Sequence, residues 1–493
     1  MRVCHAVMPI VVFLSTALVA TVLSAQGPLK DPAPPMVHEL PPLASPAAKP
    51  FEALTTVAKA KPLAAAAQTS DWPSFLGSRR DAKVRETHLL QTWPKNGPQL
   101  LWSMRRGEGY ASPVILGERL IYTHRQGDNI LIDCLHAETG QRFWRYRYTT
   151  TYTPEYFGSG PCASPVIEGE RIWVHGIDGK LLCFDAPTGR IVWQRDLHKD
   201  FDLQQQFFGV ATSPLLLGQH LIINLGKRGG PTVAAFDKAT GRIIWGAGRK
   251  WGMSCSSPII APLHGKQRLF VLTGGKSRPT KGGLLVIDPI AGTTLSEFPF
   301  RSRIYQSVNG SCPVVVGSTV MLTSSYGTGT VGVSIGKDGG ATQTWKTRNV
   351  GLEFANAVEV GGNIYMVDGI RDRGGAIVCI EPNKGIELGR TEIDWSETVT
   401  MRGRERELDF GLGTGSLLHL GEDQFLCLTD NGHLLRLKCT PKAATVLNRV
   451  SLFHAGETWT PLVLSRGLLY VCQNQPEKIG AAPRRLLCFD LRQ

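Results

Sequence analysis

Short apolar runs separated by turn residues follow one another along most of the chain, and this pattern predicts β-strands. One well-marked unit begins with the Ser-Pro-Val-Ile run at residues 164–167 and continues through apolar runs at residues 171–174 and 182–185. It ends at residues 188–193, where a Thr-Gly turn precedes Arg-Ile-Val-Trp. The unit therefore contains four short strands, which we name A to D.

This unit is repeated along the chain. Its eight starts lie at Pro113, Pro165, Pro214, Pro258, Pro313, Ala357, Leu417 and Pro461, so that consecutive starts are between 44 (Pro214 to Pro258) and 60 (Ala357 to Leu417) residues apart. Repeats of this length with four strands each are typical of propeller blades. The sequence therefore predicts an all-β fold, an eight-bladed β-propeller in which the tryptophan of strand D packs between neighbouring blades.

The last unit is incomplete, and a strand near the start of the chain matches what it lacks. After Asp490 the chain ends at Gln493 without a strand D, whereas residues 99–104 have the pattern of a strand D with no strands A to C before it. We therefore expect this N-terminal strand to complete the last blade, because closing the ring removes exposed sheet edges.

The region before the propeller divides into two segments. A basic start, an apolar run over residues 7–23 and Ser24-Ala25 predict a cleavable signal peptide at residues 1–25. The alternative is a retained membrane anchor, for which the run is marginal in length. Residues 26–70 are rich in proline and alanine and predict a disordered, extended linker, so the propeller is expected at residues 71–493.

Composition and cysteine placement narrow the class of protein. A hydrophobic content of 42% in 493 residues excludes a disordered chain and a small disulfide scaffold. Cys134, Cys183, Cys379 and Cys488 occupy one repeated slot that holds Ala235 in another unit, so we expect them to be packed in the core. The sequence leaves any disulfide pairing open.

The repeated Ser-Pro-Val start, the Leu-Cys/Ala-Phe-Asp strand and the Thr-Gly-x-x-x-Trp end resemble the tryptophan-docked blades of the pyrroloquinoline quinone (PQQ) repeat superfamily. The segment Asp-Trp-Pro-Ser-Phe-Leu-Gly at residues 71–77 is similar to exported bacterial PQQ-like propellers. The resemblance implies two branches, quinoprotein alcohol dehydrogenases and a propeller lipoprotein of the outer-membrane assembly machine. The vicinal disulfide of the first branch and the lipid-attachment cysteine of the second are both missing from this sequence.

A site would lie where the longer connections gather. If strands alternate in direction, the D–A and B–C connections share one end of the ring, here called the loop-rich end, and the A–B and C–D turns share the other, the turn end. Function tends to lie on long loops of a rigid scaffold. Segments that enter the channel there carry the candidate cofactor-binding residues Tyr110, Trp251, Asn309, Asn356 and Trp459.

These residues suggest one specific chemistry and one plain alternative. The aromatic rings could stack on a planar ligand such as PQQ, and Asn309, Asn356, Glu353 and Glu457 could offer oxygen atoms to calcium. Asp409 and Glu353 are the candidate catalytic bases. Alternatively, the same groups cap strand starts and line a water-filled channel, and no metal site is assigned.

Charge indicates the kind of partner. The net charge is +13, and basic residues outnumber acidic ones in the B–C loops. The basic residues there are Arg125, Lys227, Arg228, Lys276, Arg278, Lys281, Arg371, Arg373, Lys478 and Arg484. Such a rim suits an anionic small molecule or an envelope protein. The run Arg-Gly-Arg-Glu-Arg-Glu at residues 402–407 alternates in charge and has no interleaved aromatic residues, which argues against nucleic acid.

Two functions are consistent with these observations. The first is an exported, periplasmic or extracellular, monomeric propeller that acts as a non-catalytic scaffold for a ligand or protein. The second is a dehydrogenase that uses PQQ and calcium to oxidise an alcohol or sugar. We favour the scaffold, because neither the disulfide nor a set of calcium-binding and catalytic side chains can be aligned with the dehydrogenases.

Overall fold

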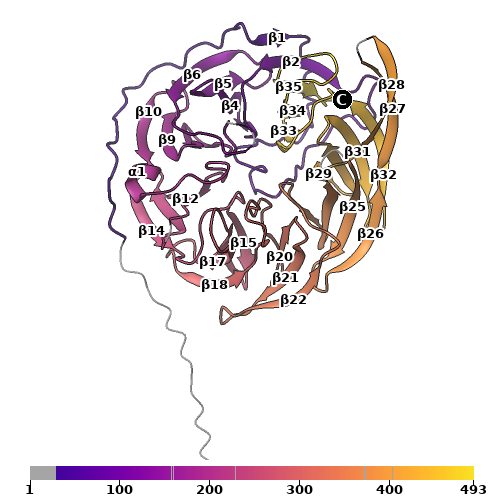
Figure 1. Cartoon of the computed structure of the whole chain (residues 1–493). Helices are drawn as coiled ribbons and strands as arrows, with labels where there is room; N and C mark the ends of the chain where they lie inside the picture. The colour runs from indigo at the N-terminus through magenta and orange to yellow at the C-terminus, as the bar shows by residue number, and fades with distance from the viewer. Residues whose placement is uncertain (1–28, 157, 159, 228, 371–372, 402) are drawn as a thin grey trace, which may run out of the picture.

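Small antiparallel sheets are arranged in a ring around a central axis (Figure 1). The computed structural model describes residues 29–493 except residues 157, 159, 228, 371–372 and 402, so the predicted signal peptide at residues 1–25 lies outside the described residues. The predicted all-β, eight-bladed propeller is confirmed, and the described part of the chain has one short helix, α1 (Leu197–Phe201). Within it, no helix has the length and hydropathy that crossing a membrane requires.

The first four blades each have four strands, from the innermost strand A to the outermost strand D (Figure 1). Blade 1 contains β3 (Val114–Leu116), β4 (Arg119–Gln126), β5 (Asn129–His136) and β6 (Arg142–Thr149), and blade 2 contains β7 (Val166–Glu168), β8 (Arg171–His175), β9 (Lys180–Asp185) and β10 (Ile191–Asp196). Blade 3 contains β11 (Leu215–Leu217), β12 (His220–Asn224), β13 (Val233–Asp237) and β14 (Ile243–Ala247), and blade 4 contains β15 (Ile259–Leu263), β16 (Lys266–Thr273), β17 (Gly283–Ile287) and β18 (Thr294–Pro299).

The remaining blades follow the same plan, with one insertion. Blade 5 contains β19 (Val314–Val316), β20 (Thr319–Ser324), β21 (Gly329–Ile335) and β22 (Ala341–Thr347), and blade 6 contains β23 (Val358–Val360), β24 (Asn363–Ile370), β25 (Arg373–Glu381) and β26 (Ile386–Glu392). A hairpin of β27 (Asp394–Met401) and β28 (Arg404–Gly411) precedes blade 7, which contains β29 (Ser416–Gly421), β30 (Gln424–Leu428), β31 (His433–Cys439) and β32 (Ala444–Ser451).

Blade 8 closes the ring as the sequence predicts. It contains β33 (Val463–Ser465), β34 (Leu468–Gln473) and β35 (Arg485–Asp490) from the end of the chain and β2 (Gln99–Arg105) from near its start. Strand β2 pairs antiparallel with β35, with Trp102 opposite Cys488. The two ends of the propeller sequence are thus held together by one ladder of hydrogen bonds.

The hydrophobic core lies between neighbouring blades, and the tryptophans of strand D lie at its outer margin. Trp144 of blade 1 donates its indole N–H to the carbonyl of Ala186 in blade 2 at 2.9 Å. Gly189 of blade 2 lies beneath the same ring at a φ of +71°, and a Cβ there would come within 2.5 Å of the indole. The Thr-Gly turn therefore needs glycine both for its backbone conformation and for the close approach of the tryptophan.

All ten cysteines in the described part of the chain are free thiols. The four that share the repeated slot, Cys134, Cys183, Cys379 and Cys488, are at most 3% exposed. The prediction that they act as small apolar core residues is confirmed.

Residues 29–70 differ from the disordered linker that the sequence predicts. This segment, here called the belt, runs along the outside of the ring (Figure 1), where β1 (Leu54–Thr56) pairs with β2 as a fifth strand of blade 8. The amide of His38 donates to the carbonyl of Val192 at 2.8 Å, and Asp31 forms an ion pair with Arg195 at 2.7 Å. The belt needs no core of its own, because the outer edges of blades 8, 1, 2 and 3 supply its hydrogen-bond partners.

Residues 72–89, here called the plug, cross the turn end of the central channel. Trp72, which is 2% exposed, pairs with Ile115 of β3, and Arg80 donates to the carbonyl of Pro214 at 2.8 Å. Farther along, Lys83 forms a bridge with His419 of β29. The plug therefore closes this end of the ring by contacting strands A of several blades.

Candidate functional site: the two ends of the channel

The loop-rich mouth of the channel is filled by aromatic side chains. The rings of Tyr110 and Trp459 stack with centroids 5.4 Å apart and planes inclined by 24°, and Phe354 packs on Trp459 at 5.0 Å. Two of the predicted cofactor-binding residues are thus brought together as expected. They contact each other, however, and leave no slot between them for a planar ligand.

The polar group beside this stack is Glu457, whose Oε2 accepts two hydrogen bonds. The Tyr110 hydroxyl donates to Glu457 Oε2 at 2.8 Å, and the amide of Gln475 donates to the same oxygen at 2.6 Å. Burial raises the pKa of Tyr110, and the adjacent Glu457 carboxylate raises it further, so the phenol stays protonated and remains a donor. This arrangement stabilises the mouth in a closed form.

The other three predicted cofactor ligands support the blades. Asn309 is fully buried, and its amide donates to the carbonyls of Thr273 and Phe300 at 2.8 and 2.9 Å. Asn356 accepts a hydrogen bond from the backbone amide of Cys312 at 2.8 Å. Trp251 packs over Gly283 of β17, where a Cβ would lie 2.6 Å from the indole.

The two candidate bases lie in different parts of the molecule. Glu353 accepts a hydrogen bond from the Tyr326 hydroxyl at 2.6 Å and lines a hollow of about 720 Å³ between blades 5 and 6. Asp409 belongs to β28, is exposed, and accepts from the Ser396 hydroxyl at 2.7 Å. Residues 394–411, which carry Asp409, alternate in polarity and form the β27–β28 hairpin.

The geometry does not fit PQQ held by calcium in the channel mouth of the loop-rich end. Between the plug and the aromatic stack remains a cavity of about 10 Å³, lined by Leu76, Phe354, Ala355, Asn356, Thr414, Ser416, Leu417, Trp459 and Pro461. That volume is enough for about one water molecule. In the described residues, Asn309 Oδ1 is buried without a partner, but no group of three His, Cys, Asp or Glu side chains gathers as a metal site. Calcium needs six or more oxygen ligands.

A cluster of aromatic and basic residues lies elsewhere on the loop-rich end. Phe207 is buried, and Tyr156, Phe208 and Tyr305 surround it with ring centroids 5.7, 6.5 and 5.0 Å away. The guanidinium of Arg278 lies 3.9 Å from the centre of the Tyr305 ring, and the Lys276 ammonium lies 5.3 Å from that of Phe207. These six residues are here called the aromatic patch.

The loops that carry the aromatic patch are fastened to one another. Lys276 forms an ion pair with Glu155 at 2.6 Å, and its backbone amide donates to the side chain of Gln206 at 2.8 Å. The amide of Gln205 donates to the carbonyl of Thr153 at 2.8 Å. Blade connections that are far apart in sequence thus present one surface.

The predicted basic rim is only partly present at the surface. Arg125 is 8% exposed and donates to the carbonyls of Gly127 and Tyr152, so it is a structural residue. Arg484 is bound to Asn474 and Gln475. Arg228 and Arg371 lie outside the described residues, and the side chain of Arg373 is not described. Of the predicted rim residues, Lys276, Arg278, Lys281 and Lys478 are exposed. The first three lie in the B–C loop of blade 4, where Lys276 and Arg278 are beside aromatic rings.

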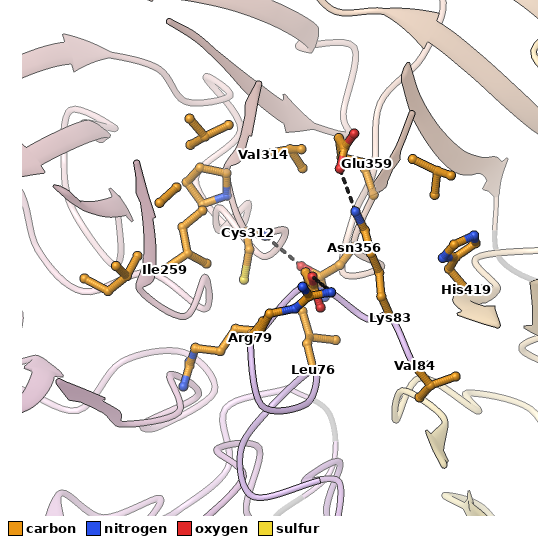
Figure 2. Close-up of a pocket in the computed structure, with 18 of the residues that line it drawn as sticks. Leu76, Arg79, Lys83, Val84, Ile259, Cys312, Val314, Asn356, Glu359 and His419 are labelled. Carbon is orange, nitrogen blue, oxygen red and sulfur yellow. Dashed lines mark hydrogen bonds and ion pairs between the residues drawn. The ribbon is translucent and has the colours of Figure 1, made fainter. Parts of the chain in front are cut away.

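The turn end has an opening of its own, a pocket of about 580 Å³ between the plug and strands A of blades 4 to 7, here called the turn-end pocket (Figure 2). Leu76, Ile259 and Val314 provide apolar wall, and Asn356 and Cys312 lie at its inner side (Figure 2). Lys83 reaches from the plug to Glu359 and forms an ion pair at 2.6 Å.

The electrostatics of the turn-end pocket are positive. Arg79, Arg80, Lys83 and Arg85 line it, against the carboxylates of Asp81 and Glu359. Burial lowers the pKa of Arg80 to about 10, which leaves it charged at neutral pH. The hydrogen bond from Lys83 helps to lower the pKa of Glu359 against the opposing effect of burial, so this carboxylate is ionised too. Burial also lowers the pKa of His419.

Sequence reasoning did not identify the plug, the turn-end pocket or the aromatic patch. The patch had a usable signal, because Tyr156, Phe207 and Phe208 are aromatic residues in long connections of the loop-rich end, where the loop with Lys276 and Arg278 is also expected. The turn-end pocket had no such signal, because its walls come from strands A of separate repeats, and these strands have similar sequences.

Comparison with known proteins identifies the type of propeller. The family described as "Outer membrane protein assembly factor BamB" matches residues 127–391. The quinohemoprotein alcohol dehydrogenase of Comamonas testosteroni is 24% identical over 192 residues, which is 36% of this chain and 26% of that protein. The chain spans about a quarter of the length of the curated relatives it matches.

Two solved structures show the same fold. BamB from Moraxella catarrhalis matches with a TM-score of 0.50 at 14% identity, over 80% of this chain and 98% of that one. A europium-containing methanol dehydrogenase matches with a TM-score of 0.57 at 12% identity, over 86% of this chain and 98% of that one. At this identity both structures support the propeller fold and do not choose between a scaffold and a dehydrogenase.

Proposed function

The chain belongs to the PQQ-repeat family described as "Outer membrane protein assembly factor BamB", and from this premise we propose that it is an exported binding scaffold of the cell envelope without a catalytic centre. The proposal places the partner, a protein, on the loop-rich end. Matched proteins include the alcohol dehydrogenase of Comamonas testosteroni and BamB of Moraxella catarrhalis, so bacterial envelope proteins are among the relatives.

The aromatic patch is the observation that carries this proposal. Tyr156 is 50% exposed, Ile304 beside the patch is 48% exposed, and Arg278 extends over the Tyr305 ring. Aromatic residues and arginine are the side chains enriched at the centres of protein interfaces. The loops beneath them are cross-linked by hydrogen bonds, so the surface needs little ordering when a partner binds. The cations favour a partner with acidic groups at its edge.

The packing of the channel supports the absence of a catalytic centre. A dehydrogenase of the alternative kind would need PQQ and calcium where Tyr110, Trp459 and Phe354 now fill the mouth. Its base would need to lie near the quinone, whereas Asp409 is on an exposed hairpin and Glu353 is bound to Tyr326. Oxidation of an alcohol or sugar therefore finds no assembled site in the channel mouth.

The test uses two exposed isoleucines at opposite ends of the blade 4 region. A photo-crosslinking amino acid is placed at Ile304, beside the aromatic patch, or at Ile290, which is 64% exposed in the C–D turn of blade 4. In producing cells we expect an adduct of defined mass from position 304 and none from position 290. The adduct should be lost when Tyr156→Ala and Arg278→Ala are introduced, since both side chains are exposed parts of the patch.

Two results would overturn the proposal. The first is adduct formation that is equal at positions 304 and 290, or that is unchanged by Tyr156→Ala and Arg278→Ala. The second is reduction of a dye with an alcohol or sugar by the purified protein in the presence of PQQ and calcium, which would indicate the dehydrogenase instead.

A further inference from the structure

We infer that the turn-end pocket binds a small organic anion that combines one acidic group with a compact apolar body. This site lies at the opposite end of the channel from the aromatic patch and goes beyond the proposed scaffold function. The pocket volume of about 580 Å³ is within the range of small-molecule sites. Its existence does not depend on what the loop-rich end binds.

The charges around the pocket select the sign of the ligand. Four basic side chains of the plug face two carboxylates, which leaves an excess of two positive charges. Glu359 is committed to Lys83 at 2.6 Å, and Asp81 to Arg79 at 3.2 Å. Low-dielectric walls strengthen the field of the remaining cations. A cationic ligand would meet these charges without a free carboxylate to receive it.

Two donors that line the pocket are not used within the described part of the chain. Arg85 is exposed and makes no hydrogen bond or ion pair there. Asn356 uses its Oδ1 to accept from the backbone amide of Cys312, and its Nδ2 has no partner among the described residues. A guanidinium and an amide N–H₂ are both donors, which suits a carboxylate and not another donor.

The apolar side chains of the pocket wall indicate that the ligand also has an apolar part. Leu76, Ile259, Val314, Val315 and Ala357 line the pocket together with the cations. An inorganic anion would leave this apolar surface exposed to water, whereas an aliphatic or aromatic body of a few carbon atoms would cover it. The ligand class is therefore an amphiphilic organic acid, with its acidic group towards Arg85 and its apolar body towards the walls.

Calorimetric titration of the full mature chain with sodium octanoate tests this inference. Acetate lacks the apolar body, 1-octanol lacks the charge, and octylammonium has the opposite charge. We expect saturable binding of octanoate and affinities at least about tenfold weaker for the other three compounds. Octanoate binding should also weaken as the salt concentration rises, because part of the attraction is between charges.

Variants localise the binding. Arg85→Gln should weaken octanoate binding by about fivefold or more, because it removes an exposed cation without touching the core. Asn356→Asp keeps the acceptor for Cys312 and replaces the N–H₂ donor by an oxygen, so binding should weaken as well. Lys266→Gln, at the exposed first residue of β16 and at the same end of the ring, is the matched control and should change nothing.

No saturable octanoate binding, equal binding of octanoate and octylammonium, or unchanged affinity in Arg85→Gln would each overturn the inference. The result is independent of the scaffold proposal. Crosslinking at Ile304 reports on the loop-rich end, whereas octanoate titration reports on the turn end, so either can fail while the other holds.

Discussion

The two ends of the central channel are closed in different ways. At the loop-rich end, Tyr110, Phe354 and Trp459 come from the D–A connections of the blades themselves and pack on one another. At the turn end, a separate segment, the plug, lies across the ring and contacts strands A of only some blades. A single segment cannot fill a ring evenly, and the turn-end pocket is the space left beside blades 4 to 7.

The two ends also differ in their titratable groups. In the described residues, the histidines whose pKa is lowered by burial at the loop-rich end are His124, His175, His198, His433 and His454, and the one at the turn end is His419. The turn end owes its charge to arginine and lysine instead. Acid should therefore destabilise the loop-rich end of the channel before the turn end.

The largest expected effect is on the plug. Trp72→Ala should lower the free energy of unfolding by about 3–5 kcal/mol, because it empties a site that is 2% exposed and packed against Gly77. Trp459→Ala, the matched change at the loop-rich end, should cost only about 1–2 kcal/mol, since this ring is half-buried and loses mainly its stacking partners.

Denaturant unfolding of the two variants measures this difference. Equal losses of unfolding free energy, or a larger loss for Trp459→Ala, would contradict this account. The plug would then not be part of the core, or the aromatic stack would be more than a surface layer over it.

The next effect is the dependence of stability on pH. Burial lowers the pKa of His175 from 6.5 to about 3 in the folded protein. Between these values the unfolded chain binds a proton that the folded chain does not, so the stability is complete above about pH 6.5 and is lost as the pH falls. One such group contributes about 1.4 kcal/mol for each pH unit in this window.

The melting temperature should therefore fall less steeply between about pH 7 and about pH 4 for His175→Gln than for the parent chain. Thermal unfolding at a series of pH values measures this slope. His88→Gln, at an exposed position in the plug, is the control. Hydrogen exchange should show amides of the loop-rich end losing protection first on acidification. Earlier loss at the turn end would refute the asymmetry.

The smallest effect concerns one hydroxyl. Tyr110→Phe keeps the stack on Trp459 and removes the donor to Glu457, which retains the hydrogen bond from Gln475. We expect a loss of about 1 kcal/mol in unfolding free energy. A loss as large as that of Trp72→Ala would show that the hydrogen bond to Glu457, rather than ring packing, closes this end.

Most of the fold could be predicted from the sequence, because every blade repeats the same local rules. The slot of Cys183 and the Thr-Gly turn before Trp193 are readable from periodicity alone, and so is the role of residues 99–104 in closing the ring. The belt was missed because its order comes from the outer edges of the blades and not from its own composition.

The candidate site was harder to predict, because the same residue type can bind a ligand or support the backbone, and the sequence does not distinguish the two roles. Asn309 and Asn356 have the side chains of calcium ligands, yet both are held by backbone groups of their own blades. Tyr110 and Trp459 were correctly placed at the mouth, but a sequence does not show that two rings fill the space they face. The plug contacts several repeats at once and therefore carries no periodic signal.

The central claim is that the loop-rich end of the channel is filled by the protein's own side chains. Calorimetric titration of the protein with PQQ in millimolar calcium tests it most directly, with Arg85→Gln as the background in which the proposed anion binding at the turn end is weakened. The account predicts no saturable heat in Arg85→Gln that depends on calcium. Saturable binding that persists in Arg85→Gln, disappears on chelation of calcium and is accompanied by dye reduction with an alcohol or sugar would contradict it.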